Sequence, residues 1–247
     1  MPITNRTLAC LIRLYQTITQ THNDVDLDIL EFGLADYIMA ISVNPKSYEF
    51  LKALHDRANA EGDFRDLLEV TERTLGRANH HSGGGTHRDR LINALRLDGY
   101  ELSSGTLTPT TPAPASLGPQ ISQLENDLTQ ANLDVAATHY GQACDNFTRG
   151  RWEASNGSPR SFLENLYIEL GTRKTGTKHS TPHSSLQGLE QQQHIDAREH
   201  QMLKIFFNNI HDQGPHHGRS SEHEALFRLH VGTAIGRYLL RRLDGGT

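Results

Sequence analysis

Apolar residues recur every three or four positions along most of the chain, which is the period of an amphipathic α-helix. In the first half this pattern predicts helices over residues 7–22, 26–39, 44–54, 64–75 and 88–97. The second of these helices has its apolar residues in phase at Leu27, Leu30, Leu34, Tyr37 and Ile38. The stretch Gly99–Thr108 instead predicts a small β-hairpin. Because strand patterns are almost absent elsewhere, we expect an all-α fold with one hairpin.

A stretch rich in Thr, Pro, Ala and Ser follows the hairpin, and this composition is typical of a linker. We therefore expect an N-terminal helical domain over 1–108, a linker over 109–119 and a C-terminal helical domain over 120–247. In the C-terminal domain, residues 124–149 predict a long helix or a helix pair. Asn156 and Pro159 predict the N-cap and the first residue of the next helix. A polar stretch follows that helix, and a final pair of helices comes after the polar stretch.

The turn between the last two helices, Asn209–Arg219, holds three histidines and an arginine. The helix before it carries an apolar face made of Leu203, Phe206, Phe207 and Ile210. After it, Ser221 and Glu224 form a capping-box pattern that opens a helix running towards Leu240. A helix N-terminus binds anions, and Arg219 lies beside this one. The pattern favours chemistry on a phosphate, and a well-capped turn without chemistry is the alternative.

The composition of the chain limits the partners and the compartment that we expect for this protein. The formal net charge of -5 argues against a general electrostatic grip on nucleic acid, although a local basic site is compatible with it. The two cysteines, Cys10 and Cys144, are far apart and favour a reducing compartment. No run approaches the ~18 apolar residues of a membrane span, and the N-terminus lacks the apolar core of a secretion signal. We expect a cytoplasmic protein without a membrane partner.

The histidine turn offers the groups that a metal-independent ribonuclease needs. His216 is suited to act as base or acid on the ribose 2′-hydroxyl because the pKa of histidine lies near neutrality. Arg219 is suited to hold the phosphate, together with His217 and the backbone amides near Ser220. His211 is a further catalytic candidate, or else it caps the preceding helix. The bland alternative is a set of solvated turn residues.

A second group of candidates lies beside the only tryptophan, Trp152. Arg149 and Arg151 occupy a predicted junction between helices, and Arg160 lies on the following helix. They could form a basic wall for RNA, or serve as cations at a helix terminus with a structural role. The clustered histidines have neither cysteine companions nor HExxH spacing, and no phosphate-binding glycine loop occurs. We therefore expect no metal and no cofactor.

The C-terminal half resembles the abortive-infection C-terminal family of bacterial phage-defence proteins, which is related to the HEPN superfamily. The resemblance lies in the order of three segments: Phe147-Thr-Arg-Gly-Arg-Trp-Glu-Ala, Ser158-Pro-Arg-Ser-Phe-Leu-Glu, and a Gly-x-His-x-Gly turn before a last apolar helix. It covers residues 120–244. The segment 90–102 is similar to helical modules that precede such domains.

The resemblance implies a HEPN-like helical bundle, a homodimer formed through the C-terminal helices, and RNA or a nucleotide as partner. HEPN ribonucleases cleave RNA without metal through an arginine that precedes a histidine by a few residues. His216 matches that histidine, but Asn209, Ile210 and His211 stand where the arginine is expected. Two hypotheses follow: a degenerate metal-independent endoribonuclease, or a non-catalytic module for dimerisation or ligand sensing.

Overall fold

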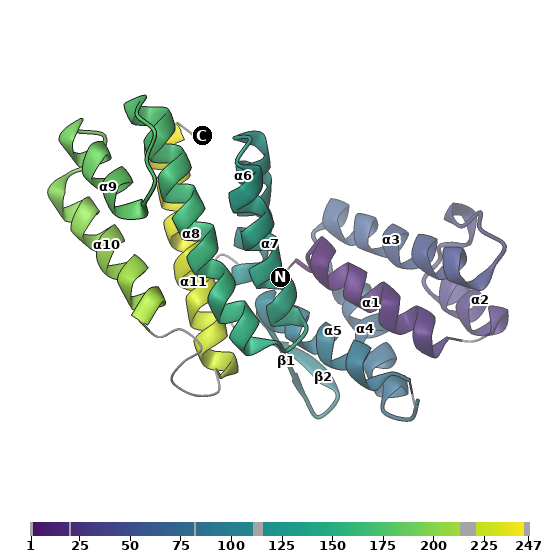
Figure 1. The fold of residues 1–247 in the computed structure, drawn as a ribbon. Helices are drawn as coiled ribbons and strands as arrows, with labels where there is room; N and C mark the ends of the chain where they lie inside the picture. Colours follow the sequence, from purple (N-terminus) through teal and green to yellow (C-terminus); the bar gives the residue numbers. More distant parts are fainter. Residues whose placement is uncertain (1, 20, 82, 111–115, 213–220, 245–247) are drawn as a thin grey trace. The chain divides into compact units, whose positions relative to one another are not determined.

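The computed structural model describes residues 2–19, 21–81, 83–110, 116–212 and 221–244, except for the side chains of 211, 212 and 244. Its chain separates into two compact units, Met1–Pro119 and Gln120–Thr247. The predicted all-α fold with one small hairpin is confirmed: helices make up nearly all of the regular structure within the described ranges (Figure 1).

The N-terminal unit packs its helices around one apolar core. Its elements are α1 (Asn5–Ile18), α2 (His22–Glu31), the short helix η1 (Ala35–Tyr37), α3 (Val43–Glu61), α4 (Arg65–Ala78), α5 (Gly85–Leu97), β1 (Tyr100–Ser103) and β2 (Thr106–Pro109). Helix α1 packs against α3, α4 and α5, and its apolar stripe, which includes Leu11 and Leu14, is buried except at Ile18, which is partly buried. The strands are antiparallel, and positive φ angles at Ser104 and Gly105 form the tight turn between them.

Helix α2 departs from the prediction. It ends at Glu31 because Gly33 takes a left-handed conformation with φ of 65°, which a glycine adopts at little cost. Leu27 and Leu30 are consequently exposed, and the buried face consists of Val25, Asp28 and Ile29. The predicted apolar phase over 26–39 was therefore wrong.

The C-terminal unit is arranged around one long helix. Its elements are α6 (Leu117–Gln130, of which the first three residues belong to the N-terminal unit), α7 (Asp134–Thr148), α8 (Trp152–Thr175), α9 (Pro182–Gln191), α10 (Ala197–Asp212), α11 (Glu222–Leu239) and a π-helical turn, η3 (Leu240–Asp244). Helix α8 packs against α7, α9, α10 and α11, and Figure 1 shows α11 running alongside it. The predicted helix pair over 124–149 corresponds to α6 and α7.

The start of α8 also differs from the prediction. The helix begins at Trp152, whose ring packs on Phe147 with centroids 5.1 Å apart, so Asn156 and Pro159 lie inside the helix. Proline at this position removes one backbone hydrogen bond. The ring of Pro159 is buried and packs against α11 close to Gly232. The polar stretch after α8, expected to separate helices, contributes most of α9.

Within the described ranges, no helix has both the length and the apolar character that a bilayer crossing requires.

Candidate functional site

The junction of α8, α10 and α11 is the part of the C-terminal unit that bears on the predicted histidine site. His216, His217, Arg219 and Ser220 lie outside the described residues, and so does the side chain of His211. What the structure does describe is the frame: the last turn of α10 and the first turns of α11. Ser221 caps α11 by accepting a hydrogen bond from the Glu224 amide at 3.2 Å, as the capping pattern predicted.

Arg228 is a buried cation at this junction that sequence reasoning missed. Its side chain is only 4% exposed, and its Nη2 donates to Glu224 Oε1 at 2.6 Å. Its Nη1 lies 3.4 Å from the carbonyl oxygen of Ile210 in α10 and 3.5 Å from that of Asn156 in α8. A cation near the C-terminal carbonyls of a helix is favourable, and this one joins three helices. The Glu224 side chain therefore turns to Arg228 instead of closing the predicted capping box.

Asn156 is the second unexpected residue at the junction. It is 4% exposed, yet neither its Oδ1 nor its Nδ2 has a hydrogen-bond partner among the described residues. One turn further along the same face of α8, Arg160 buries its Nε, and no described residue pairs with it. An unpaired buried polar group costs on the order of 1–3 kcal/mol, so groups of this kind commonly mark a position for water or a ligand. Helix α8 thus carries two residues with buried polar atoms that no described group pairs with, and one of them, Asn156, lies beside Arg228.

The other predicted basic residues occupy the turn between α7 and α8. Arg149 is exposed at the C-terminus of α7 and pairs with Asp145 at 2.9 Å. Arg151 is exposed at the N-cap of α8 and makes no side-chain capping bond. Arg160 follows roughly two and a half turns later on α8. The structure therefore places Arg149 and Arg151 together and Arg160 at a distance from both.

An apolar groove of about 560 Å³ separates α10 from α11. Its walls include Met202 and Phe206 from α10, and Val231, Ala234 and Ile235 from α11. Further exposed apolar residues, Ile205 and Phe227, lie on the same two helices. By helical spacing, each shares a face with a residue of the groove. We call this surface the α10–α11 face.

A polar clamp closes the end of the groove opposite the junction. Asp196 and Glu199 cap α10: Glu199 Oε2 accepts from the Asp196 amide at 2.6 Å. The other Glu199 oxygen accepts from Tyr238 of α11 and from Arg242 Nε. Burial raises the pKa of Glu199, but the hydrogen bonds from Arg242 and Tyr238 outweigh burial and lower the pKa to about 2. The two helices are thus fixed at one end by Glu199 and at the other by Arg228.

Among the described residues, no three His, Cys, Asp or Glu side chains are grouped so that they could hold a metal ion. Comparison with protein-family models, curated proteins and solved structures finds no match to this chain. The features of the site itself therefore carry the functional argument.

Proposed function

We propose that this chain is a cytoplasmic, bacterial phage-defence or toxin-type protein whose C-terminal unit is a HEPN-like module acting as a homodimer. The resemblance of residues 120–244 supports the defence role. The homodimer is supported by the exposed apolar side chains of the α10–α11 face. Contiguous exposed apolar surface on a water-soluble protein marks an interaction site, and aromatic and Met side chains are enriched in such interfaces.

Self-association follows from the geometry of the face. Helices α10 and α11 run antiparallel, because Arg228 contacts the end of α10 while Tyr238 contacts its start. A two-fold axis through the groove would bring the same pair of helices from a second copy against it. The result is a four-helix contact in which the apolar side chains of both copies lose their exposure to water.

The dimer is tested by light scattering coupled to size-exclusion chromatography on the full chain. Met202→Glu and Ala234→Glu place a charge on exposed positions of the groove, so we expect each variant to convert a dimer into a monomer. Leu27→Glu, at an even more exposed apolar position of α2, is the matched control and should remain dimeric. A monomeric wild type at tens of micromolar, or dimeric groove variants, would show that the face does not self-associate.

The second candidate function is metal-independent RNA cleavage, and the buried polar groups of α8 that lack a described partner favour it. Asn156 and Arg160 lie beside the helices that flank the histidine segment, so they could hold a phosphate or its water while His216 acts on the ribose. Arg219, Ser220, His217 and His211 remain the candidates within that segment. Exposed Arg151, with Arg149, would contact the RNA backbone.

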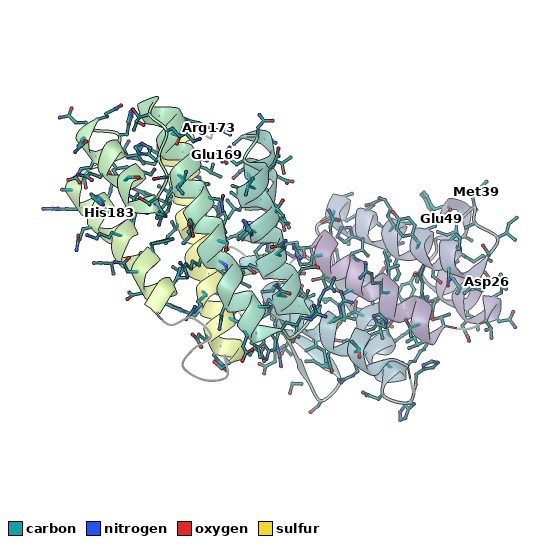
Figure 2. The ribbon with its side chains drawn as sticks, in the orientation of Figure 1. Asp26, Met39, Glu49, Glu169, Arg173 and His183 are labelled. Atoms are coloured by element: carbon teal, nitrogen blue, oxygen red, sulfur yellow. The ribbon has the colours of Figure 1, made fainter. Side chains whose placement is uncertain are left out.

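Cleavage is tested by expressing wild type and His216→Ala and measuring growth and RNA integrity, with a parallel assay of purified protein in excess EDTA. We expect growth arrest and RNA degradation from the wild type and not from His216→Ala. His183→Ala, which alters an exposed histidine on α9 (Figure 2), is the matched control. If His216→Ala cleaves as well as wild type, His216 is not catalytic. If neither protein cleaves and the dimer persists, the non-catalytic module is the better proposal.

The defence role has its own test. Cells that express the chain are challenged with a panel of phages, and the plating efficiency is compared with that of cells expressing Ala234→Glu. A reduced efficiency that requires the intact groove supports the proposal. Unchanged plating across the whole panel contradicts it.

A further inference from the structure

The N-terminal unit carries a groove of its own along α3. A cavity of about 600 Å³ lies between this helix and the segment that connects α2 to η1. Its apolar lining comes from Gly33, Leu34, Tyr37, Tyr48, Ala53 and Ala60. From Tyr48 to Glu61 the groove follows roughly 20 Å of helix, which is long enough for three to four turns of a bound helix. We call it the α3 groove.

The loop beside the groove presents its apolar side chains to water. Tyr37, Met39 and Ile41 are 71%, 84% and 87% exposed, and Tyr48 of α3 is half exposed. Single exposed apolar residues are ordinary, but a run of this kind next to a groove marks an interaction surface. Tyrosine is also among the residues that contribute most to binding at protein interfaces.

The backbone of this loop is held in place while its side chains face outward. Glu49 Oε2 accepts hydrogen bonds from the amides of Met39 at 2.8 Å and Ala40 at 2.9 Å. Figure 2 shows Met39 and Glu49 at the same end of the unit. Arg57 fixes the other side by donating to the carbonyl oxygen of Phe32 at 2.9 Å. A loop that is ordered in advance loses less entropy when a partner binds.

Charge identifies the kind of partner. Both cations that line the groove are engaged, since Lys52 pairs with Asp56 at 2.5 Å and Arg57 with Asp66 at 2.7 Å. Glu61, which lines the groove, and Asp36, next to Tyr37, have no ion pair among the described residues. The surface is therefore apolar with an acidic surplus.

An acidic surplus disfavours several partners. Phosphate groups of RNA and anionic lipid headgroups are repelled by it. A second copy of the same groove would bring two acidic rims together, which opposes association. A basic segment with large apolar side chains satisfies both features of the surface, because its cations meet the carboxylates while its apolar residues enter the groove.

We propose that the α3 groove, together with the Tyr37–Ile41 loop, binds a basic amphipathic segment of a partner protein. This surface is separate from the α10–α11 face and does not depend on the proposed homodimer. It gives the N-terminal unit a recognition role.

The test begins with a displayed library of random 16-residue peptides selected on the full-length protein. We expect enrichment of peptides with Lys or Arg together with Leu, Phe or Trp at helical spacing. The most enriched peptide is synthesised with a fluorescent label, and its Kd is measured by anisotropy in low and high salt. Because the attraction is partly ionic, binding should weaken as salt rises. Selection of acidic peptides, or no enrichment at all, would overturn the proposal.

Variants locate the binding surface. Met39→Ser with Ile41→Ser removes two fully exposed side chains and should weaken the Kd about tenfold or more, as expected when interface anchors are lost. Glu61→Lys reverses a rim charge, leaves the loop intact, and should weaken binding and reduce its salt dependence. Val135→Ser, at an exposed apolar position of α7, is the matched control and should bind normally. Unchanged binding by both groove variants, or loss of binding in the control, would rule out the α3 groove.

Discussion

Gly171 of α8 packs closely against Ser185 of α9, so its replacement by alanine tests this contact directly. A Cβ at this position would lie 1.8 Å from Ser185 Oγ and 3.0 Å from Ser185 Cβ. The hydroxyl cannot simply turn away, because Ser185 is fully buried and its Oγ donates to the Tyr167 carbonyl oxygen at 2.5 Å. Gly157, on the same helix, offers a matched control, since a Cβ there has no neighbour within 4 Å in the described part of the chain.

The size of the effect follows from three contributions. Replacing glycine by alanine inside a helix stabilises it by roughly 1 kcal/mol, and this gain applies to both positions. At Gly171 alone, overpacking costs about 1–3 kcal/mol, and losing the buried hydrogen bond costs about 1 kcal/mol more. We therefore expect Gly157→Ala to stabilise the C-terminal unit by about 1 kcal/mol. Gly171→Ala should destabilise it by about 1–3 kcal/mol.

The fluorescence of Trp152 measures this directly. It is the only tryptophan of the chain and belongs to α8, so its signal in a urea titration reports unfolding of the C-terminal unit. Adding Ser185→Ala to Gly171→Ala removes the closest clashing atom and should restore part of the stability. If Gly171→Ala is as stable as Gly157→Ala, the close packing of α8 on α9 described above is incorrect.

Three further perturbations probe buried and paired charges. Arg228→Met should destabilise the C-terminal unit by about 3 kcal/mol. This is the low end of the cost of breaking a buried ion pair, because the Glu224 side chain is 34% exposed. A loss below about 1 kcal/mol in the Trp152 titration would contradict the role of Arg228 in joining the three helices. Because the pKa of Glu199 is lowered, its contribution to stability is complete above pH 4.5 and is lost as the pH falls towards 2. In urea titrations repeated over this pH range, the free energy of unfolding should therefore fall less steeply with acidification in Glu199→Gln than in the wild type. Burial raises the pKa of Asp98 to about 6, so its contribution has the opposite sign: it is complete below pH 3.8 and declines by about 3 kcal/mol as the pH rises through 6. Circular dichroism melts between pH 4 and 7 should show this decline, and its persistence in Asp98→Asn would exclude Asp98 as the cause.

The elements that the sequence predicts well are those specified by local chemistry. The stripe of α1 is buried as its spacing requires, and the Ser221 cap opens α11 at the expected residue. The hairpin forms around Ser104 and Gly105, where the chain needs positive φ angles. In each case the side chains and the backbone conformation of a few neighbouring residues decide the outcome.

Buried polar residues account for the most informative failure. The true inner face of α2 includes Asp28, whose carboxylate accepts from the buried Tyr15 hydroxyl at 2.5 Å. A pattern search that equates burial with apolar residues passes over this aspartate and selects Leu27 and Leu30, which are exposed. Arg228 was missed for the same reason, although a signal existed. It follows Glu224 by one helical turn and lies in phase with the buried Ala225 and Leu229.

The apolar arc of α10 shows how an exposed apolar face can be anticipated from sequence. The predicted face grouped Leu203, Phe206, Phe207 and Ile210 on one side of the helix. The structure divides this group. Leu203 and Ile210 are buried, Phe207 packs on Tyr167 with ring centroids 5.8 Å apart, and Phe206 turns into the groove beside Met202. An apolar arc wider than the core can cover leaves part of a helix exposed, and a partner is one way to cover it. The width of the arc, more than the histidine turn that follows it, is therefore the sequence feature that favours self-association of this unit.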